Sequence, residues 1–109
     1  MNAIFERQKE LQLKLYNLTD EQLEDVAKMY YSATAMMVEV GELLQSDTRW
    51  KKVVTGSPRP TKFNREEFLE EYADVMLYLL NVAIFNGLSY YDIIQTVTRK
   101  QEKNFKRLL

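Results

Sequence analysis

The stretch Phe68-Leu-Glu-Glu-Tyr-Ala-Asp-Val-Met-Leu-Tyr-Leu-Leu80 decides the fold of this chain, because its apolar residues recur with a helical period. From Tyr72 to Phe85 the pattern is apolar on almost every side, and a helix of that kind is buried. A chain of 109 residues has little material to surround such a helix. The sequence therefore predicts an all-α protein that assembles as a dimer or a larger oligomer.

Two pairs of acids interrupt the apolar pattern. Glu71 and Asp74 lie in the stretch above, and Glu39 and Glu42 lie in the apolar run Ala33-Thr-Ala-Met-Met-Val-Glu-Val-Gly-Glu-Leu-Leu44. Each pair has i,i+3 spacing, which places both side chains on one side of a helix. Burying four carboxylates is unfavourable unless a positive charge neutralises them, so a divalent cation is the simplest ligand. The alternative is that these acids are solvated edges or pair with lysines.

The amino-acid composition limits which metals and which partners the chain is expected to bind. The chain contains no cysteine and no histidine, which removes the usual zinc and iron ligands and the commonest general base. A hard cation on carboxylate oxygens remains, Mg²⁺ first and Mn²⁺ as the alternative. A net charge of −1 argues against a general nucleic-acid binder. The N-terminus has no hydrophobic signal core and no apolar run is long enough for a bilayer, so we expect a cytoplasmic protein.

The helical pattern continues along most of the chain, which reads as a single domain over residues 1–109. We expect one crossover loop and four helices in a small bundle. The first helix covers about 3–16, the second opens at a capping box at 19–22 and reaches about 45, the loop covers 46–63, the third begins at Asn64 and stops at Gly87, and Ser89 with Asp92 caps the fourth.

The fourth helix carries a polar strip formed by Lys100, Asn104 and Arg107. These residues continue the line of Ile93 and Val97, where an amphipathic helix would stay apolar. Lysine, amide and arginine side chains beside a cation suit a polyphosphate. The alternative is a frayed basic C-terminus that complements the helix dipole.

Amides and one indole are candidates for contact with a base. Gln8 and Gln12 fall inside the apolar pattern of the first helix, and Asn81 shares a face with the acids of the third. Trp50 could stack on a base, and Lys51 or Lys52 could reach phosphate. The alternatives are amides that point to water and a tryptophan that anchors the core.

Taken together, the motifs resemble the all-α nucleoside triphosphate pyrophosphohydrolases, the superfamily of MazG-like proteins, dCTP pyrophosphatases and dimeric dUTPases. The resemblance rests on Glu39-Val-Gly-Glu42, on Glu71-Tyr-Ala-Asp74, and on Lys100-Gln-Glu-Lys-Asn104-Phe-Lys-Arg107. Trp50-Lys51 after the first acidic motif is also similar. The matching residues extend from about Gln8 to Arg107.

The resemblance implies an activity and a set of roles. The four acids would bind one or two Mg²⁺ ions, and the strip on the fourth helix would hold phosphate oxygens. Water activated by the metal and by a carboxylate such as Glu39 or Glu42 would attack the α-phosphorus and release pyrophosphate. The Gln-rich first helix resembles that of the dimeric dUTPases, whereas the short chain is more similar to MazG-like and dCTP-type enzymes. We therefore expect a pyrimidine deoxynucleotide, dUTP or dCTP.

Two other classes compete with this interpretation. A di-iron carboxylate bundle normally uses Glu-x-x-His motifs, and the chain has no histidine. A helical interaction module without enzymatic activity stays open, and it predicts no dependence on a divalent ion.

Overall fold

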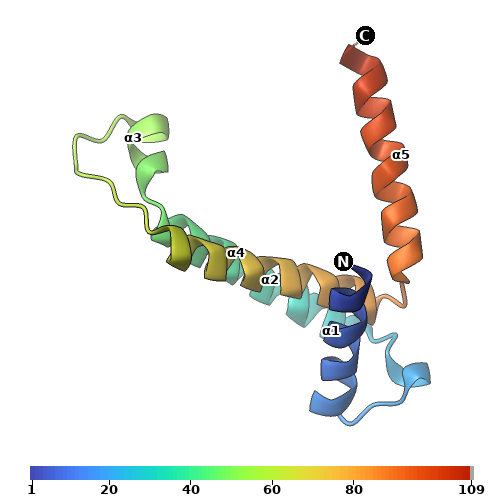
Figure 1. The fold of residues 1–109 in the computed structure, drawn as a ribbon. Helices are drawn as coiled ribbons and strands as arrows, with labels where there is room; N and C mark the ends of the chain where they lie inside the picture. Colours follow the sequence, from blue (N-terminus) through green and yellow to red (C-terminus); the bar gives the residue numbers. More distant parts are fainter. Residues whose placement is uncertain (109) are drawn as a thin grey trace.

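The computed structural model describes residues 1–108, which form an all-α chain (Figure 1). The elements in order are α1 (Asn2–Leu15), the short 3-10 turn η1 (Asp20–Gln22), α2 (Val26–Ser46), α3 (Arg49–Thr55), α4 (Arg65–Phe85) and α5 (Tyr90–Leu108). No helix among the described residues combines the length and the apolar character that a membrane crossing requires. The all-α class predicted from the sequence is confirmed.

The two longest helices, α2 and α4, lie side by side and run in opposite directions, forming a two-helix layer (Figure 1). α3 and the following loop connect them at one end of this layer. An isolated antiparallel bridge between Asp47 and Phe63 closes that connection. The Arg49 guanidinium lies 3.9 Å from the centre of the Phe63 ring and adds a cation–π contact there.

The hydrophobic core sits at the other end of the layer, where α1 packs against the C-terminal half of α4. Its buried members are Phe5, Leu23, Leu80, Ile84 and Phe85. The backbone N–H of Asp25 donates to the carbonyl of Phe85 over 2.9 Å, so the start of α2 satisfies a carbonyl at the end of α4. This small core fixes α1 across α4 and thereby places α1 beside both long helices.

Capping residues confirm two predicted helix starts. Asn64 accepts a hydrogen bond from the backbone N–H of Glu67 over 3.0 Å at the start of α4. Ser89 and Asp92 exchange hydrogen bonds at the start of α5, with the Asp92 N–H donating to Ser89 Oγ over 3.1 Å. The predicted stop is also present, because Gly87 adopts a left-handed φ of 71° just beyond α4.

Two predicted boundaries were wrong. The capping box of Thr19 and Gln22 forms, but it caps only η1, and α2 begins later, behind Asp25, whose side chain accepts from the Lys28 N–H. A capping box stabilises a single turn and does not require the helix to continue. The predicted loop 46–63 contains α3, which Gly56 ends in a left-handed conformation. The glycine and prolines at 56–60 favour a loop, but they lie after α3 and not within it.

The isolated chain is open. Its radius of gyration is 17.3 Å, whereas a compact domain of this size has about 13 Å. α5 accounts for much of the difference, because it projects away from the other helices (Figure 1). Only its first turn is held, with Tyr90 and Ile93 packed against the core. The four long helices predicted from the sequence are present, but within one chain α5 does not pack along the layer.

Candidate functional site

Three carboxylates converge between α2 and α4. Glu39 and Glu42 come from consecutive turns of α2, and Glu71 comes from α4. Each offers an oxygen such that the three oxygens lie within 4.8 Å of one another. The i,i+3 spacing puts the α2 pair on one side of that helix, and the antiparallel packing brings α4 alongside. Helix pairing therefore produces a compact acidic cluster from residues that are far apart in sequence.

Two carboxylate oxygens of the cluster accept no hydrogen bond. Glu39 Oε2 and Glu71 Oε2 are buried and have no hydrogen-bond partner. The ion pairs found among residues 1–108 all involve other acids. A buried carboxylate oxygen without a partner is unfavourable and calls for an explanation such as an ion. This is the strongest local evidence for a bound cation.

Electrostatics support the same conclusion. Burial raises the pKa of the Glu39 carboxyl above its ordinary value, and the adjacent Glu42 raises it further. Burial also raises the pKa of Glu71, with the negative charges of Glu42 and Asp74 adding to the effect. Both carboxyls thus hold protons more tightly than free glutamates do. A divalent cation would replace those protons and restore the charged forms.

Asp74 lies at the edge of this cluster. It is exposed and is not one of the three converging oxygen donors, but its charge raises the pKa of both Glu39 and Glu71. It also lines the neighbouring pocket. Asp74 therefore joins the acidic cluster to the pocket.

The donor set fits a hard divalent ion. All three converging groups are carboxylates, and the chain has neither histidine nor cysteine. Mg²⁺ and Mn²⁺ are bound in proteins through one or a few such oxygens, with water or phosphate completing the coordination.

The pocket beside Asp74 has a volume of about 300 Å³ and is formed by α1, α2 and α4. The side chains that line this pocket include the three amides predicted to contact a base, Gln8, Gln12 and Asn81. Gln8 Nε2 donates to Asn81 Oδ1 over 2.9 Å. Gln12 and Asn81 are almost fully buried. The structure therefore brings together amides that are 73 residues apart in sequence.

Seven further lining residues are not among the site residues predicted from the sequence. They are Leu11, Leu15, Tyr16, Tyr31, Ser32, Leu77 and Tyr78. Burial raises the pKa of the Tyr78 phenol, with Tyr31 and Glu39 contributing, so Tyr78 remains a hydrogen-bond donor at neutral pH. A signal was available for Ser32 and Tyr78, because Ser32 lies seven residues before Glu39 and Tyr78 lies four residues after Asp74.

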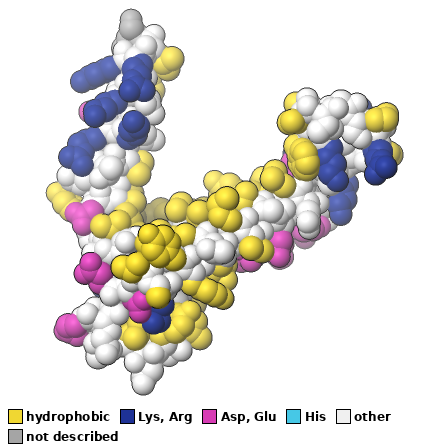
Figure 2. Space-filling view, turned by 180° about the vertical axis from the view of Figure 1, so that it is seen from behind, with side chains coloured by type: hydrophobic (Ala, Val, Ile, Leu, Met, Phe, Trp, Pro, Cys, Tyr) yellow, Lys and Arg dark blue, Asp and Glu magenta, His cyan; other side chains and the backbone are white. Residues whose placement is uncertain are grey.

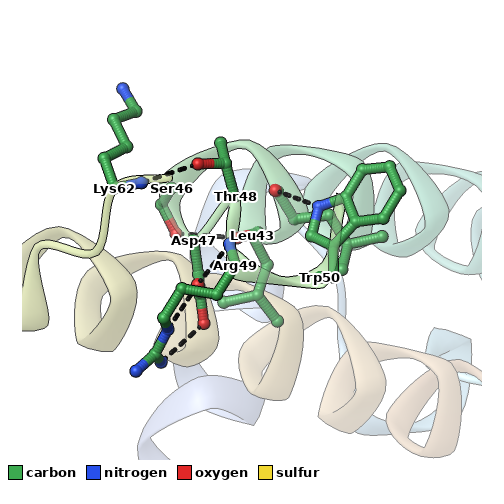
Figure 3. Close-up of polar contacts among 8 residues, drawn as sticks. Leu43, Ser46, Asp47, Thr48, Arg49, Trp50 and Lys62 are labelled. Atoms are coloured by element: carbon green, nitrogen blue, oxygen red, sulfur yellow. Dashed lines mark hydrogen bonds and ion pairs between the residues drawn. The ribbon is translucent and has the colours of Figure 1, made fainter. Parts of the chain in front are cut away.

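Trp50 and Lys51 occupy a different part of the molecule. Both lie on α3, and Trp50 Nε1 donates to the carbonyl of Leu44 over 2.8 Å (Figure 3). The Lys51 ammonium is 5.8 Å from the centre of the Trp50 ring. Neither residue lines the pocket. In the same region Arg49 pairs with Asp47 over 2.8 Å, which fixes the start of α3 (Figure 3).

The polar strip of Lys100, Asn104 and Arg107 lies on α5, and all three residues are exposed. Because α5 projects away from the layer, these side chains do not join the acidic cluster within one chain (Figure 1).

A family model described as dUTPase matches residues 1–109. Comparison with curated proteins and with solved structures gave no match.

Proposed function

The chain belongs to the dUTPase family, within the all-α superfamily that includes the MazG-like proteins, and from this premise we propose that it hydrolyses a pyrimidine deoxynucleoside triphosphate. The products are the nucleoside monophosphate and pyrophosphate. Because the matching family model is described as dUTPase, we propose dUTP as the first candidate substrate and dCTP as the second. We propose the cytoplasm as its location.

One observation carries this proposal. Two buried carboxylate oxygens without hydrogen-bond partners, on Glu39 and Glu71, lie beside a pocket with buried amides, and Asp74 belongs to the surroundings of both. A triphosphate nucleotide needs both environments, one for a cation with its phosphates and one for a base.

The pocket suits a nucleoside. The hydrogen bond between the amides leaves the Gln8 oxygen able to accept and the Asn81 NH₂ group able to donate, and a pyrimidine edge offers the complementary groups. Trp50 is proposed as a further base contact, which requires α3 to approach the pocket. The buried Gln12 lies on the same wall and is assigned to base contact as well.

The cluster supplies the reaction centre. Glu39, Glu42, Glu71 and Asp74 would hold Mg²⁺, or Mn²⁺ in its place. When bound, such an ion neutralises charge on the phosphates and lowers the pKa of a coordinated water.

The carboxylates position and deprotonate the attacking water. Glu39 or Glu42 accepts a proton from it as its oxygen forms a bond to the α-phosphorus. The bond between the α-phosphorus and the bridging oxygen breaks, and pyrophosphate leaves with that electron pair. Lys51, Lys100, Asn104 and Arg107 would hold the phosphate oxygens.

The test incubates the purified full chain with each of the four canonical dNTPs and with dUTP, in Mg²⁺ and in EDTA. Ion-exchange chromatography then resolves the products. We expect a monophosphate and pyrophosphate, with the reaction abolished in EDTA. Release of orthophosphate and a diphosphate would contradict cleavage at the α-phosphorus.

A helical interaction module is the second candidate, favoured by the exposed apolar side chains of α2 and α5. That module predicts no turnover of any nucleotide in Mg²⁺ or Mn²⁺ and no effect of EDTA on stability.

A further inference from the structure

Positive charge is concentrated at the α3 end of the molecule. The net charge of −1, which argues against a general nucleic-acid binder, is an average over the whole chain. Residues 48–65 contain six basic side chains and no acidic one, and we call this segment the basic lobe. It comprises α3, the loop behind it and the first residue of α4. Figure 2 shows basic side chains gathered on this lobe, separate from those of α5. The local charge therefore attracts anions although the chain as a whole does not.

Five of the six cations of the basic lobe are available to a ligand. Arg49 is paired with Asp47, which lies just before the lobe. The other five are exposed, and none of them belongs to an ion pair found among residues 1–108. They are Lys51, Lys52, Arg59, Lys62 and Arg65. Because like charges on one lobe repel one another, an anion that contacts several of them at once is favoured.

Hydrogen bonds hold the backbone of the lobe in one shape. The Thr48 N–H donates to the carbonyl of Lys62 over 3.0 Å, and the Lys62 N–H donates to Thr48 Oγ1 over 2.8 Å (Figure 3). Behind the left-handed Gly56, the Ser57 N–H donates to the carbonyl of Lys51 over 3.4 Å. The loop is thus tied to the α3 segment at two points. The backbone that carries the cations is already ordered, which lowers the entropic cost of binding.

Apolar side chains are exposed beside these cations. Val53 and Val54 on α3 are 84% and 75% exposed. At about 100° per residue they lie on the same side of α3 as Trp50, whereas Lys51 and Lys52 lie on the other. An anion that is charged everywhere would leave this apolar side of α3 in water. The lobe therefore suits a ligand that carries both repeated negative charges and apolar surfaces.

A single strand of nucleic acid has both properties. Its phosphates repeat along the backbone, and its unpaired bases offer flat apolar faces that pack against protein side chains. A duplex encloses those faces between its strands, so it would contact the cations and leave Val53 and Val54 exposed. A free nucleotide has a single base and a short phosphate chain, which cannot extend over the helix and the loop together.

We propose that the basic lobe binds a single strand of nucleic acid, with the phosphates on its five exposed cations and the bases against Val53 and Val54. No residue of the lobe lines the amide pocket or contributes an oxygen to the acidic cluster. The strand site is therefore separate from the proposed catalytic site, and it goes beyond the proposed function.

The deciding experiment measures the affinity of the full chain for a labelled oligothymidylate of about 20 nucleotides by fluorescence anisotropy. Each neutralised phosphate of a single strand contributes about −0.7 to the slope of log K against log salt, so five cations predict a slope of about −3.5. A variant with Lys52→Gln, Arg59→Gln and Lys62→Gln should bind at least about tenfold more weakly, with a slope smaller by about 2. No binding by the wild type, or wild-type binding by this variant, would overturn the inference.

α5 provides a matched control because it is also basic. Arg99→Gln, Lys103→Gln and Lys106→Gln remove the same charge from exposed residues that have no role in the proposed catalytic site. We expect this variant to keep the wild-type affinity and salt slope. A loss as large as that of the lobe variant would place the strand on α5 or assign its binding to net charge alone, and either result would contradict the proposal.

The contact with the bases has a test of its own. Val53→Ser with Val54→Ser removes apolar surface but no charge, so binding should weaken while the salt slope stays unchanged. A duplex of the same length should bind the wild type more weakly than the single strand does. Unchanged affinity in the serine variant, or a duplex that binds as tightly as the single strand, would refute the assignment of bases to this side of α3.

Two competitors distinguish the strand site from other sites for anions. An excess of a non-hydrolysable dUTP analogue with Mg²⁺ should leave the strand bound, because it occupies the pocket and the acidic cluster. Displacement of the strand would place it at the catalytic site and overturn the inference. Vesicles of anionic phospholipid should not displace the strand either, and displacement by them would assign the lobe to a membrane surface. Both measurements are independent of turnover, so they hold whether or not the chain hydrolyses dUTP.

Discussion

Gln8 and Asn81 are joined by a hydrogen bond of 2.9 Å from Gln8 Nε2 to Asn81 Oδ1, although they lie on α1 and α4 and are 73 residues apart in sequence. The bond fixes which way the Asn81 amide faces, because its oxygen is already occupied. Asn81 is only 6% exposed, so its remaining donor is directed by this one contact rather than by solvent. Gln8 is thus a positioning residue for an amide on the pocket wall.

Removing that contact should reduce discrimination between bases. Gln8→Met keeps the size of the side chain but leaves the buried Asn81 oxygen without its donor. An unsatisfied buried acceptor of this kind carries a desolvation penalty of about 1–3 kcal/mol. The Asn81 amide can then reverse, so we expect the ratio of kcat/KM for dUTP over dCTP to fall. Gln45→Met, at an exposed glutamine of α2, should leave the ratio unchanged. A ratio unaltered by Gln8→Met would mean that this pair does not select the base.

Glu71 and Glu70 provide a matched pair for the catalytic cluster. Glu71 contributes an oxygen to the cluster, whereas its neighbour Glu70 is exposed and does not. We expect Glu71→Gln to lower the rate of pyrophosphate release by at least about 100-fold, a loss typical of a residue acting on the transition state. Glu70→Gln should stay within about twofold of wild type. Equal losses in both variants would remove Glu71 from the site.

Removal of divalent ions should destabilise the protein. An ion that binds only the folded state raises the free energy of unfolding by about 2.7 kcal/mol at a concentration 100 times its dissociation constant. Thermal unfolding in Mg²⁺ and in EDTA measures this difference. Glu39→Gln, which removes charge from the cluster, should abolish most of it. An identical melting temperature in Mg²⁺ and EDTA would argue against a cation site.

In EDTA the stability should depend on pH in a defined direction. The pKa values of Glu39 and Glu71 are raised above 4.5 in the folded protein, so folding favours their protonated forms. Their stabilising contribution to the free energy of unfolding is fully present below about pH 4.5. It is lost as the pH rises through the folded pKa values. Asp25 and Asp47 have lowered pKa values and lose their contribution only at still lower pH.

We therefore expect the metal-free melting temperature to fall as the pH is raised from about 4.5 toward neutrality, and to fall less in Glu39→Gln. The same variant should also melt higher than wild type in EDTA at neutral pH, because a source of repulsion is gone. A melting temperature that rises over this interval would have the opposite sign and would contradict the raised pKa values.

The sequence was sufficient for the local structure of the long helices. Two helix starts were predicted correctly, one from Asn64 and one from Ser89 with Asp92, and one helix end from Gly87. These predictions were possible because a cap depends on residues within one helical turn. The same locality explains the wrong start of α2, where two caps, Thr19 and Asp25, competed within six residues. The helix at Arg49–Thr55 was missed because the adjacent glycine and prolines dominate that region.

The sequence by itself determined which residue types are present and how they repeat along each helix. It placed Glu39 with Glu42 and Glu71 with Asp74, since a helix fixes neighbours at i,i+3. Only the tertiary structure decided that Glu71 joins the α2 pair while Asp74 lies at the edge facing the pocket, and that α5 leaves the layer. Local spacing follows from backbone hydrogen bonds within one turn. The meeting of two helices and the direction of a third depend on packing between segments distant in sequence, which no local pattern specifies.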